Sequence, residues 1–191
     1  MRPLPFFQGG SLNPRTVGIQ SDDLEVFLSL IESLATWTCS QEYLNQRQEK
    51  ISDWSVGQQL DHLLMADQLN LKAVRMLGMG LGQESSEGLN EAGLMVFSAG
   101  LIPFGKATAP DFVIPRTDPP VDALEQLRQD VFNGWQEVAP RLDEIDSKGL
   151  VLTHHAVGEL GAWQWLRFAR IHTQHHRNIT ERIIAEASAT S

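Results

Sequence analysis

The chain has 191 residues, of which 42% are hydrophobic, and its formal net charge is −9 at pH 7. This length and apolar content support one domain with a full-sized core. The negative charge disfavours binding to nucleic acid or to anionic lipid, because phosphate groups would be repelled. No window approaches the roughly 20 apolar residues of a membrane span. The single Cys39 has no partner for an intramolecular disulfide, so we expect a packed thiol and a cytoplasmic location.

Residues 1–20 are expected to form an N-terminal arm ahead of a single domain over residues 21–188. Two early prolines and one arginine accompany an apolar run that is too short for a signal peptide. A first amphipathic helix is then predicted from Ser21 to about Gln48, because apolar residues recur at intervals of three and four. Its weakest part in helix propensity is the Thr-rich stretch at residues 36–39.

A second helix is predicted over Val56 to Leu77, with Ser52 or Ser55 as its cap and Gly78 just after its end. The following residues, to about position 120, are rich in glycine and proline. Within them only the stretch from Asn90 to Ala99 has the pattern of a short helix. A connection this long within a small domain is typical of a crossover or a lid with a functional role. Its three phenylalanines predict that it packs onto the helices; they are Phe97, Phe104 and Phe112.

A third helix is predicted from Pro120 through Val138, and Pro140 either kinks it or begins a following segment. A loop then leads to a fourth helix from about Leu160 to Ala187. No stretch alternates convincingly at period two. Four long helices with a long link between the second and the third predict an all-α fold, a four-helix bundle with a crossover.

The fourth helix carries His172 and His176, which stand four residues apart and therefore lie on one face, where both can bind a single cation. That face is predicted to be buried, and buried imidazoles need partners. A third imidazole would complete a three-histidine metal site with open positions for water or substrate. His62, on the second helix, is the best-placed candidate.

The surroundings of these histidines predict a cavity. Small residues beside His62, with Gln58 and Gln59 one turn earlier, resemble a cavity wall more than close core packing. Trp165 and Phe168 are the corresponding candidates for lining residues on the fourth helix. Each imidazole N–H should also have an acceptor, for which Gln58 or Gln59 is a candidate.

The other three histidines leave alternatives open. His175 points about 60° to one side of His172, so it either replaces His176 as a ligand or has a non-ligand role, which we favour. His154 and His155 precede the fourth helix and are left out of the ligand set, because a pair of histidines in a loop is usually solvated.

The order of these motifs resembles that of the DinB-like superfamily, which includes the YfiT-type metalloenzymes. The shared motifs are Trp54-Ser55-Val56 followed by His62-Leu63, and the C-terminal stretch His172-Thr173-Gln174-His175-His176. The stretch from His155 to Leu160, with Trp163 and Trp165 after it, is similar to a smaller uncharacterised branch of that superfamily. The resemblance spans about residues 21 to 187.

This resemblance implies a bundle in which His62, His172 and His176 hold one divalent ion, commonly nickel or zinc. Characterised relatives include low-molecular-weight thiol S-transferases and a mycothiol-dependent maleylpyruvate isomerase, many members are labelled hydrolases, and homodimers are common. We therefore expect a metal-dependent transferase or hydrolase that acts on a small molecule, with or without a thiol cofactor. The alternative is a non-catalytic metal-binding or stress-associated protein, in which protein atoms would fill every position around the ion. A third interpretation, without metal, requires His62 to lie far from the other two histidines.

Overall fold

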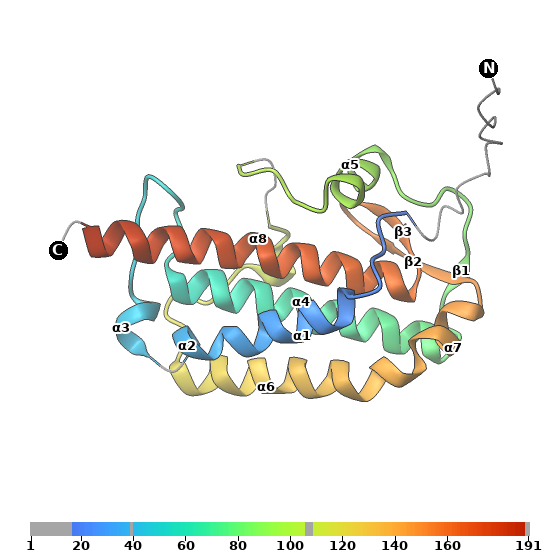
Figure 1. Cartoon of the computed structure of the whole chain (residues 1–191), viewed down its shortest axis with the longest axis horizontal. Coiled ribbons are helices and arrows are strands. Elements are labelled where there is room, and N and C mark those ends of the chain that lie inside the picture. The colour runs from blue at the N-terminus through green and yellow to red at the C-terminus, as the bar shows by residue number, and fades with distance from the viewer. Residues whose placement is uncertain (1–16, 39, 106–108, 190–191) are drawn as a thin grey trace, which may run out of the picture.

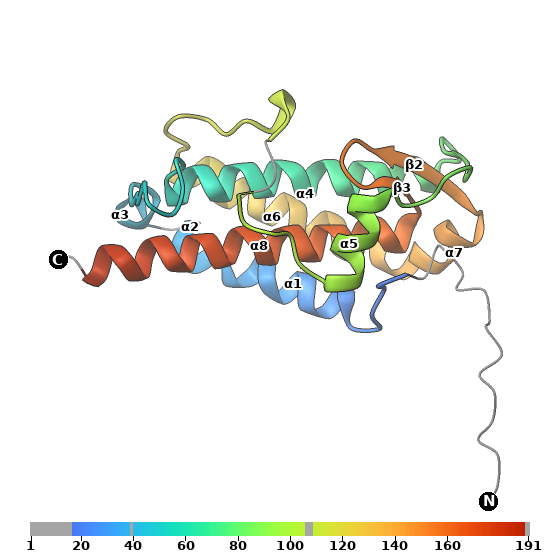
Figure 2. The same cartoon turned by 90° about the horizontal axis from the view of Figure 1, so that it is seen from above.

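The structure is a computed structural model that describes residues 17–38, 40–105 and 109–189, and these residues are mostly helical (Figure 1). Most of the predicted N-terminal arm and the whole of Cys39 lie outside them. Four helices lie side by side along the long axis of the molecule (Figures 1 and 2): α1 (Asp23–Ser33), α4 (Val56–Gly78), α6 (Val121–Val138) and α8 (Ala162–Ala189). Both α1 and α4 pack against α6 on one side and α8 on the other.

The core lies between these four helices. Trp135 of α6 is fully buried and meets Phe27 of α1 in an edge-to-face contact, with ring centroids 5.3 Å apart. Leu60 and Leu64 of α4 and Leu166 of α8 are also fully buried. The apolar faces predicted from the helical periodicity therefore meet in one continuous cluster.

The first predicted helix is shorter than expected. α1 ends at Ser33, and two single-turn helices follow it, α2 (Ala35–Thr38) and α3 (Gln41–Leu44). The first break is at Leu34, just before the Thr-rich stretch, and after α2 the extended backbone of Ser40 (φ −130°, ψ 115°) redirects the chain. The prediction of one helix to about Gln48 was therefore wrong.

The start of α4 is fixed by a capping box. The Ser55 hydroxyl accepts the backbone N–H of Gln58, and the Gln58 side chain accepts the backbone N–H of Ser55. Of the two predicted caps, Ser55 is the one used. This cap sets the rotational position of the first turns of α4, which carry His62.

A small antiparallel sheet was missed by the sequence analysis. Its strands, in spatial order, are β1 (Gln83–Glu84), β2 (Leu150–His154) and β3 (Gly158–Leu160). The β2–β3 hairpin pairs Thr153 with Glu159 and His154 with Gly158. The prediction of a mostly helical fold is confirmed, but the expectation that the fold is all-α, with a plain loop before the fourth helix, missed this small sheet. Strands of two to five residues are too short to show an alternating pattern.

The hairpin is anchored to the loop after β1 by one carboxylate. Glu159 accepts hydrogen bonds from the backbone N–H groups of Ser86, Glu87 and Gly88 and from the hydroxyl of Ser85. These donors, led by the N–H of Gly88, lower the pKa of Glu159 to about 2. The β2–β3 hairpin is thus held in a fixed position relative to the end of α4.

The connection between α4 and α6 contains regular structure besides β1. The predicted short helix is present as α5 (Glu91–Ala99), which Asn90 caps and which ends at Gly100 in a left-handed conformation (φ +65°). A 3₁₀ turn, η1 (Asp111–Val113), follows. Phe97 is buried, whereas Phe104 and Phe112 are 50% and 66% exposed, so only one of the three phenylalanines packs into the core.

After α6, Pro140 begins a new segment. It lies in the 3₁₀ turn η2 (Ala139–Arg141), which leads directly into α7 (Leu142–Ser147). Of the two alternatives for this proline, the structure therefore has a following segment and no kink within a longer helix.

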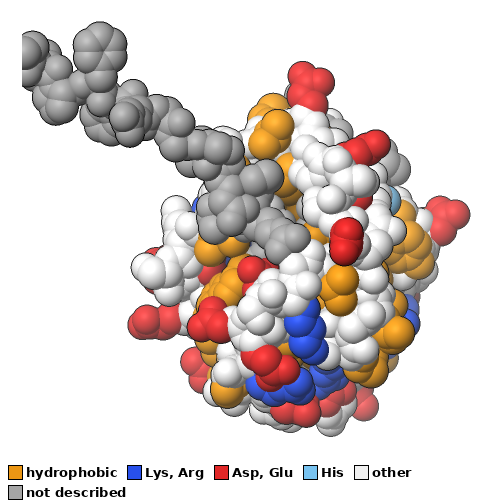
Figure 3. Space-filling model, turned by 90° about the vertical axis from the view of Figure 1, so that its right-hand side faces the viewer, with side chains coloured by type: hydrophobic (Ala, Val, Ile, Leu, Met, Phe, Trp, Pro, Cys, Tyr) orange, Lys and Arg blue, Asp and Glu red, His pale blue; other side chains and the backbone are white. Residues whose placement is uncertain are grey.

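Three of the four arginines of α8 are paired with carboxylates. Arg167 and Arg170 pair with Asp23, and Arg177 pairs with Glu181. Figure 3 shows the end of the molecule near β1 and α7, where Lys and Arg gather in one small patch among scattered acidic side chains. None of the described helices is long and apolar enough to cross a membrane.

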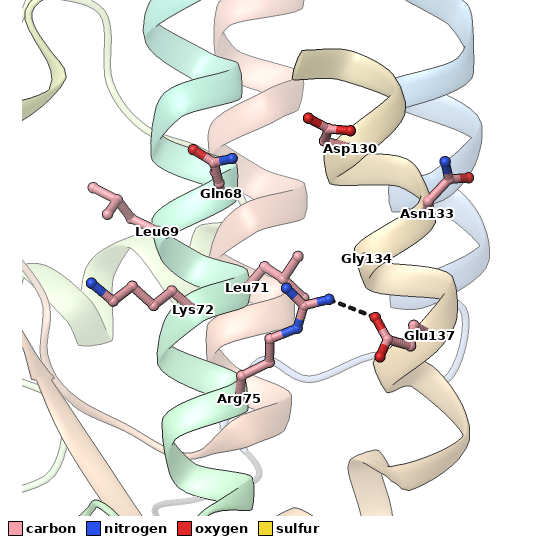
Figure 4. A pocket seen from close by; sticks show the side chains of 9 residues that line it. All are labelled: Gln68, Leu69, Leu71, Lys72, Arg75, Asp130, Asn133, Gly134 and Glu137. Atoms are coloured by element: carbon pink, nitrogen blue, oxygen red, sulfur yellow. Dashed lines mark hydrogen bonds and ion pairs between the residues drawn. The ribbon is translucent and has the colours of Figure 1, made fainter. Parts of the chain in front are cut away.

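A hollow of about 690 Å³ lies between α4 and α6 (Figure 4). It is lined by residues of both charge signs and by no histidine, and the ion pair between Arg75 and Glu137 (2.7 Å) crosses it. Gly134 lies beside it on α6, and a Cβ at this position would overlap Cδ2 of Leu71, which is buried. Gly134 therefore allows α4 and α6 to approach closely.

We expect Gly134→Val to lower the free energy of unfolding by about 2–3 kcal/mol, because the added side chain forces α4 and α6 apart. Denaturant unfolding followed by circular dichroism measures this change. The matched control is Asn133→Val on the same helix, where the side chain is exposed and the two residues have similar helix propensity, so the change should be within about 0.5 kcal/mol of zero. Equal losses in the two variants would contradict the close approach at Gly134.

Candidate metal centre

Three histidines from two helices form one cluster. His62 comes from α4, His172 and His176 come from α8, and one ligand nitrogen from each lies within 4.8 Å of the others. The ring centroids are 4.6 Å apart for His62 and His176, and 4.5 Å apart for His172 and His176. The pair on α8 is one turn apart, and the packing of α4 against α8 supplies the third ring.

The His62 ring is oriented by the connection between α4 and α6. Its Nδ1 lies 2.7 Å from the backbone carbonyl of Val113 in η1. A carbonyl only accepts, so Nδ1 carries the proton and donates, and Nε2 is left with its lone pair. A neutral imidazole with a free Nε2 is the form that binds a metal ion.

The adjacent residue fastens the same part of the connection to α4. The fully buried carboxylate of Asp61 accepts the backbone N–H of Arg116 (2.8 Å) and pairs with its guanidinium (2.5 Å). Two consecutive residues of α4 therefore hold residues 113–116: His62 bonds to the carbonyl of Val113, and Asp61 pairs with Arg116. This arrangement keeps the Val113 carbonyl in place for His62.

The His176 ring is oriented from within the helices. Its Nδ1 lies 2.6 Å from Oε1 of Gln59, and Nε2 of Gln59 donates to the hydroxyl of Ser52 (2.8 Å). Because the Gln59 nitrogen donates to Ser52, the Gln59 oxygen is the atom that faces His176, and it accepts the hydrogen bond from Nδ1 of His176. Nε2 of His176, like that of His62, therefore keeps its lone pair free to bind a metal ion.

The third ring has an unsatisfied nitrogen. Nδ1 of His172 is buried and has no hydrogen-bond partner among the described residues. A buried polar nitrogen without a partner costs free energy, and a bound cation is one group that would remove this cost. Three neutral imidazoles, two of them oriented by acceptors at Nδ1, are a donor set that suits zinc or nickel.

Burial keeps these imidazoles uncharged at neutral pH. It lowers the pKa of His172 and His176 well below the usual value, and the neighbouring histidines lower it further. It also lowers the pKa of His62, against the opposing effects of the Val113 carbonyl and the Asp61 charge. Neutral rings are ready to bind a cation without first losing a proton.

The cluster opens onto a cavity of about 650 Å³. The chain has six histidines, and all six line this cavity. Helices α4, α5 and α8, the β2–β3 hairpin and the segment around η1 supply its walls. A space of this size is in the range that accommodates a small organic ligand.

The predicted lining residues divide into two groups. Trp165 and Phe168 line the cavity. Gln58 does not, because its side chain is used in the capping box and accepts a hydrogen bond from Arg47. Gln59 is buried behind the cluster as the partner of His176 and does not line the cavity either. The two glutamines are therefore not lining residues, but Gln59 is the acceptor that one of them was expected to provide for an imidazole N–H.

The three remaining histidines also face the cavity without belonging to the cluster. His154 lies at the end of β2, with its ring 4.4 Å from that of Phe168, and burial lowers its pKa to about 4. His155, the exposed member of the hairpin pair, contacts Phe112. His175 bonds to the backbone of Ile102 and lies against Phe104, outside the ligand group.

The sequence analysis missed Val113, Asp61 and Arg116 as residues that support the site. A backbone carbonyl carries no signal in the residue type, so Val113 could not have been found. Asp61 directly precedes His62, and a carboxylate on the buried part of a helix is a signal that a partner must exist. The partner itself depends on the path of the connection.

The fold and the cluster together define a mostly helical protein with a three-histidine group that could hold a metal ion. The sequence model of the DinB superfamily matches residues 22–179, and the chain therefore belongs to the DinB superfamily. The resemblance seen in the sequence motifs is confirmed. Searches of curated proteins and of solved structures gave no match.

We expect Gln59→Ala to weaken metal binding by about 10- to 100-fold, because the His176 ring loses the acceptor that fixes its orientation. Competition with a chelator of known affinity measures the change for zinc and for nickel. Gln68→Ala, an exposed glutamine on the same helix, is the control and should leave the affinity unchanged. If Gln59→Ala binds both metals like the unaltered protein, the Gln59 amide does not orient a ligand.

Proposed function

We propose that this chain is a metal-dependent enzyme in which His62, His172 and His176 hold one divalent ion, nickel or zinc, within a four-helix bundle that spans residues 21–188. The reaction is hydrolysis of a small molecule or transfer of a low-molecular-weight thiol to it. The observation that carries the proposal is the position of the three imidazoles at the wall of a 650 Å³ cavity. Membership of the DinB superfamily supports it.

The chemistry follows from the donor set. A divalent ion on three imidazoles lowers the pKa of a water or thiol that it binds, which provides a nucleophile near neutral pH. The residues of the chain orient the ligands: Gln59 and the Val113 carbonyl each hold one ring by its Nδ1 proton. Trp165 and Phe168 restrict the access of water to the cluster from the α8 side.

The cavity favours an enzyme over a non-catalytic metal protein. In a structural site protein atoms fill all positions around the ion, whereas a catalytic site keeps at least one position for water or substrate. Here the group of ligand residues contains three histidines and no carboxylate or thiol among the described residues. The adjoining space is large enough for a substrate to reach the remaining positions.

Metal analysis of untagged protein tests this proposal. After incubation with zinc or nickel and dialysis, we expect about one ion per chain in the unaltered protein and less than about a tenth of that in a His172→Ala/His176→Ala variant. His155→Ala removes an exposed cavity histidine outside the cluster and should keep its ion. Circular dichroism shows whether each variant is folded. Equal metal content in the double variant and the unaltered protein would refute the site.

A further inference from the structure

We infer that the molecule that enters this cavity has an uncharged, largely apolar body and no ionised group other than one that contacts the ion directly. The inference rests on the proposed function for the role of the ion. It rests on the cavity walls for the chemistry of the substrate. It gives a substrate class for the site at which we propose hydrolysis or thiol transfer.

The described walls of the cavity carry no Asp, Glu, Lys or Arg. Apart from the histidines and two tryptophans, the polar side chains that line it are those of Asn70 and Thr153. The remaining surface is aliphatic and aromatic, and its members include Trp54, Ala66, Val96, Ile102, Trp165 and Phe168. Such walls bind an apolar body through burial of its surface.

Four ionisable side chains near the cavity do not line it: those of Asp61, Asp67, Arg116 and Arg182. Asp61 is paired with Arg116, and Arg182 lies over the ring of Phe104, 5.0 Å from its centroid. Asp67 is fully buried and accepts the Thr173 hydroxyl (2.6 Å). Among the described walls, a carboxylate or sulfonate on a ligand would therefore lose hydration without gaining a cationic side chain as its partner, which costs free energy.

The mouth of the cavity has the same character as its walls. Leu69, Met95 and Phe112 line the cavity and are also 39%, 54% and 66% exposed. Exposed large apolar side chains at the entrance of an apolar cavity favour the approach of an apolar molecule. A thiol that carries several carboxylates would have to leave its charged part outside this rim.

A matched pair of fluorescent probes tests the inference on the full-length protein. N-phenyl-1-naphthylamine is uncharged, and 8-anilino-1-naphthalenesulfonate has the same ring system with one sulfonate. In metal-free protein we expect the uncharged probe to bind about tenfold more tightly or better, because the sulfonate finds no partner. Equal affinities, or tighter binding of the sulfonate, would overturn the inference.

Three variants locate the binding. Ala66→Phe fills the cavity from α4 and should weaken binding of the uncharged probe by about tenfold. Met95→Lys places a cation on the rim and should reduce the preference for the uncharged probe by about threefold or more. Leu94→Lys, at an exposed neighbour that does not line the cavity, should leave the preference unchanged. If Ala66→Phe has no effect, the probe binds elsewhere and the inference fails.

The two proposals fail in distinguishable ways. A protein that takes up no metal but keeps its preference for the uncharged probe refutes the metal site and supports the apolar cavity. A protein that binds one ion per chain but shows no preference refutes the substrate class alone.

Discussion

We expect Asp23→Ala to lower the free energy of unfolding by about 3–5 kcal/mol. Asp23 is fully buried at the start of α1 and accepts hydrogen bonds from Arg167 (2.8 Å) and Arg170 (2.7 Å) of α8. Arg167 is itself buried, so removal of the carboxylate leaves a cation without a partner in the interior. Urea unfolding of the two proteins at neutral pH measures the loss.

The neighbouring residue provides the control. Asp22 also pairs with Arg170 (2.9 Å), but its side chain is 52% exposed. Exposed ion pairs contribute about 0–1 kcal/mol, so Asp22→Ala should cost less than about 1 kcal/mol. A loss for Asp23→Ala no larger than for Asp22→Ala would contradict the role of the buried pair in joining α1 to α8.

Asp67→Asn is expected to change how stability depends on pH. Burial raises the pKa of Asp67 to about 8, against the smaller opposing effects of Thr173 and Asn70. Between about pH 4 and pH 8 the folded protein keeps this proton while the unfolded chain releases it. The contribution of this residue to the free energy of unfolding is therefore largest at low pH and decreases as the pH rises from about 4 to 8. Asparagine does not ionise in this range, so the variant should not lose free energy of unfolding at this position as the pH rises.

The expected result is a difference between the two proteins that grows with pH. The variant should gain stability relative to the unaltered protein by about 1–3 kcal/mol from pH 4 to pH 8. The buried histidines have lowered pKa values, so they lower the free energy of unfolding as the pH falls. They are present in both proteins, and their effect cancels in the difference. Thermal unfolding across this range measures it. A difference that stays constant with pH would show that Asp67 ionises at an ordinary pKa in the folded protein.

The helical part of the site could be predicted because it depends on local geometry. His172 and His176 share a face of one helix at any orientation of that helix in the fold. His62 required a second step, since its approach depends on how α4 packs against α8. It was the best-placed third histidine in the sequence, and the family resemblance supported that choice. The capping residue Ser55 could be found because a capping box has its own sequence pattern.

The rest of the site depends on contacts that leave no pattern in the sequence. The carbonyl of Val113 reaches His62 across 51 positions of the chain. His154 was expected to be solvated, but it belongs to a strand whose five residues are too few to show alternation, and the hairpin places it in the cavity wall. Gln58 and Gln59 are adjacent, and only the three-dimensional structure separates the helix cap from the partner of His176.

X-ray absorption spectroscopy of the metal-loaded protein tests the central claim most directly, because it counts the imidazoles around the ion. For zinc or nickel we expect three imidazole nitrogens with one or more oxygen donors in the unaltered protein, and two imidazoles in His62→Ala. A spectrum with three imidazoles that His62→Ala leaves unchanged, or one with fewer than two in the unaltered protein, would contradict a site shared by α4 and α8.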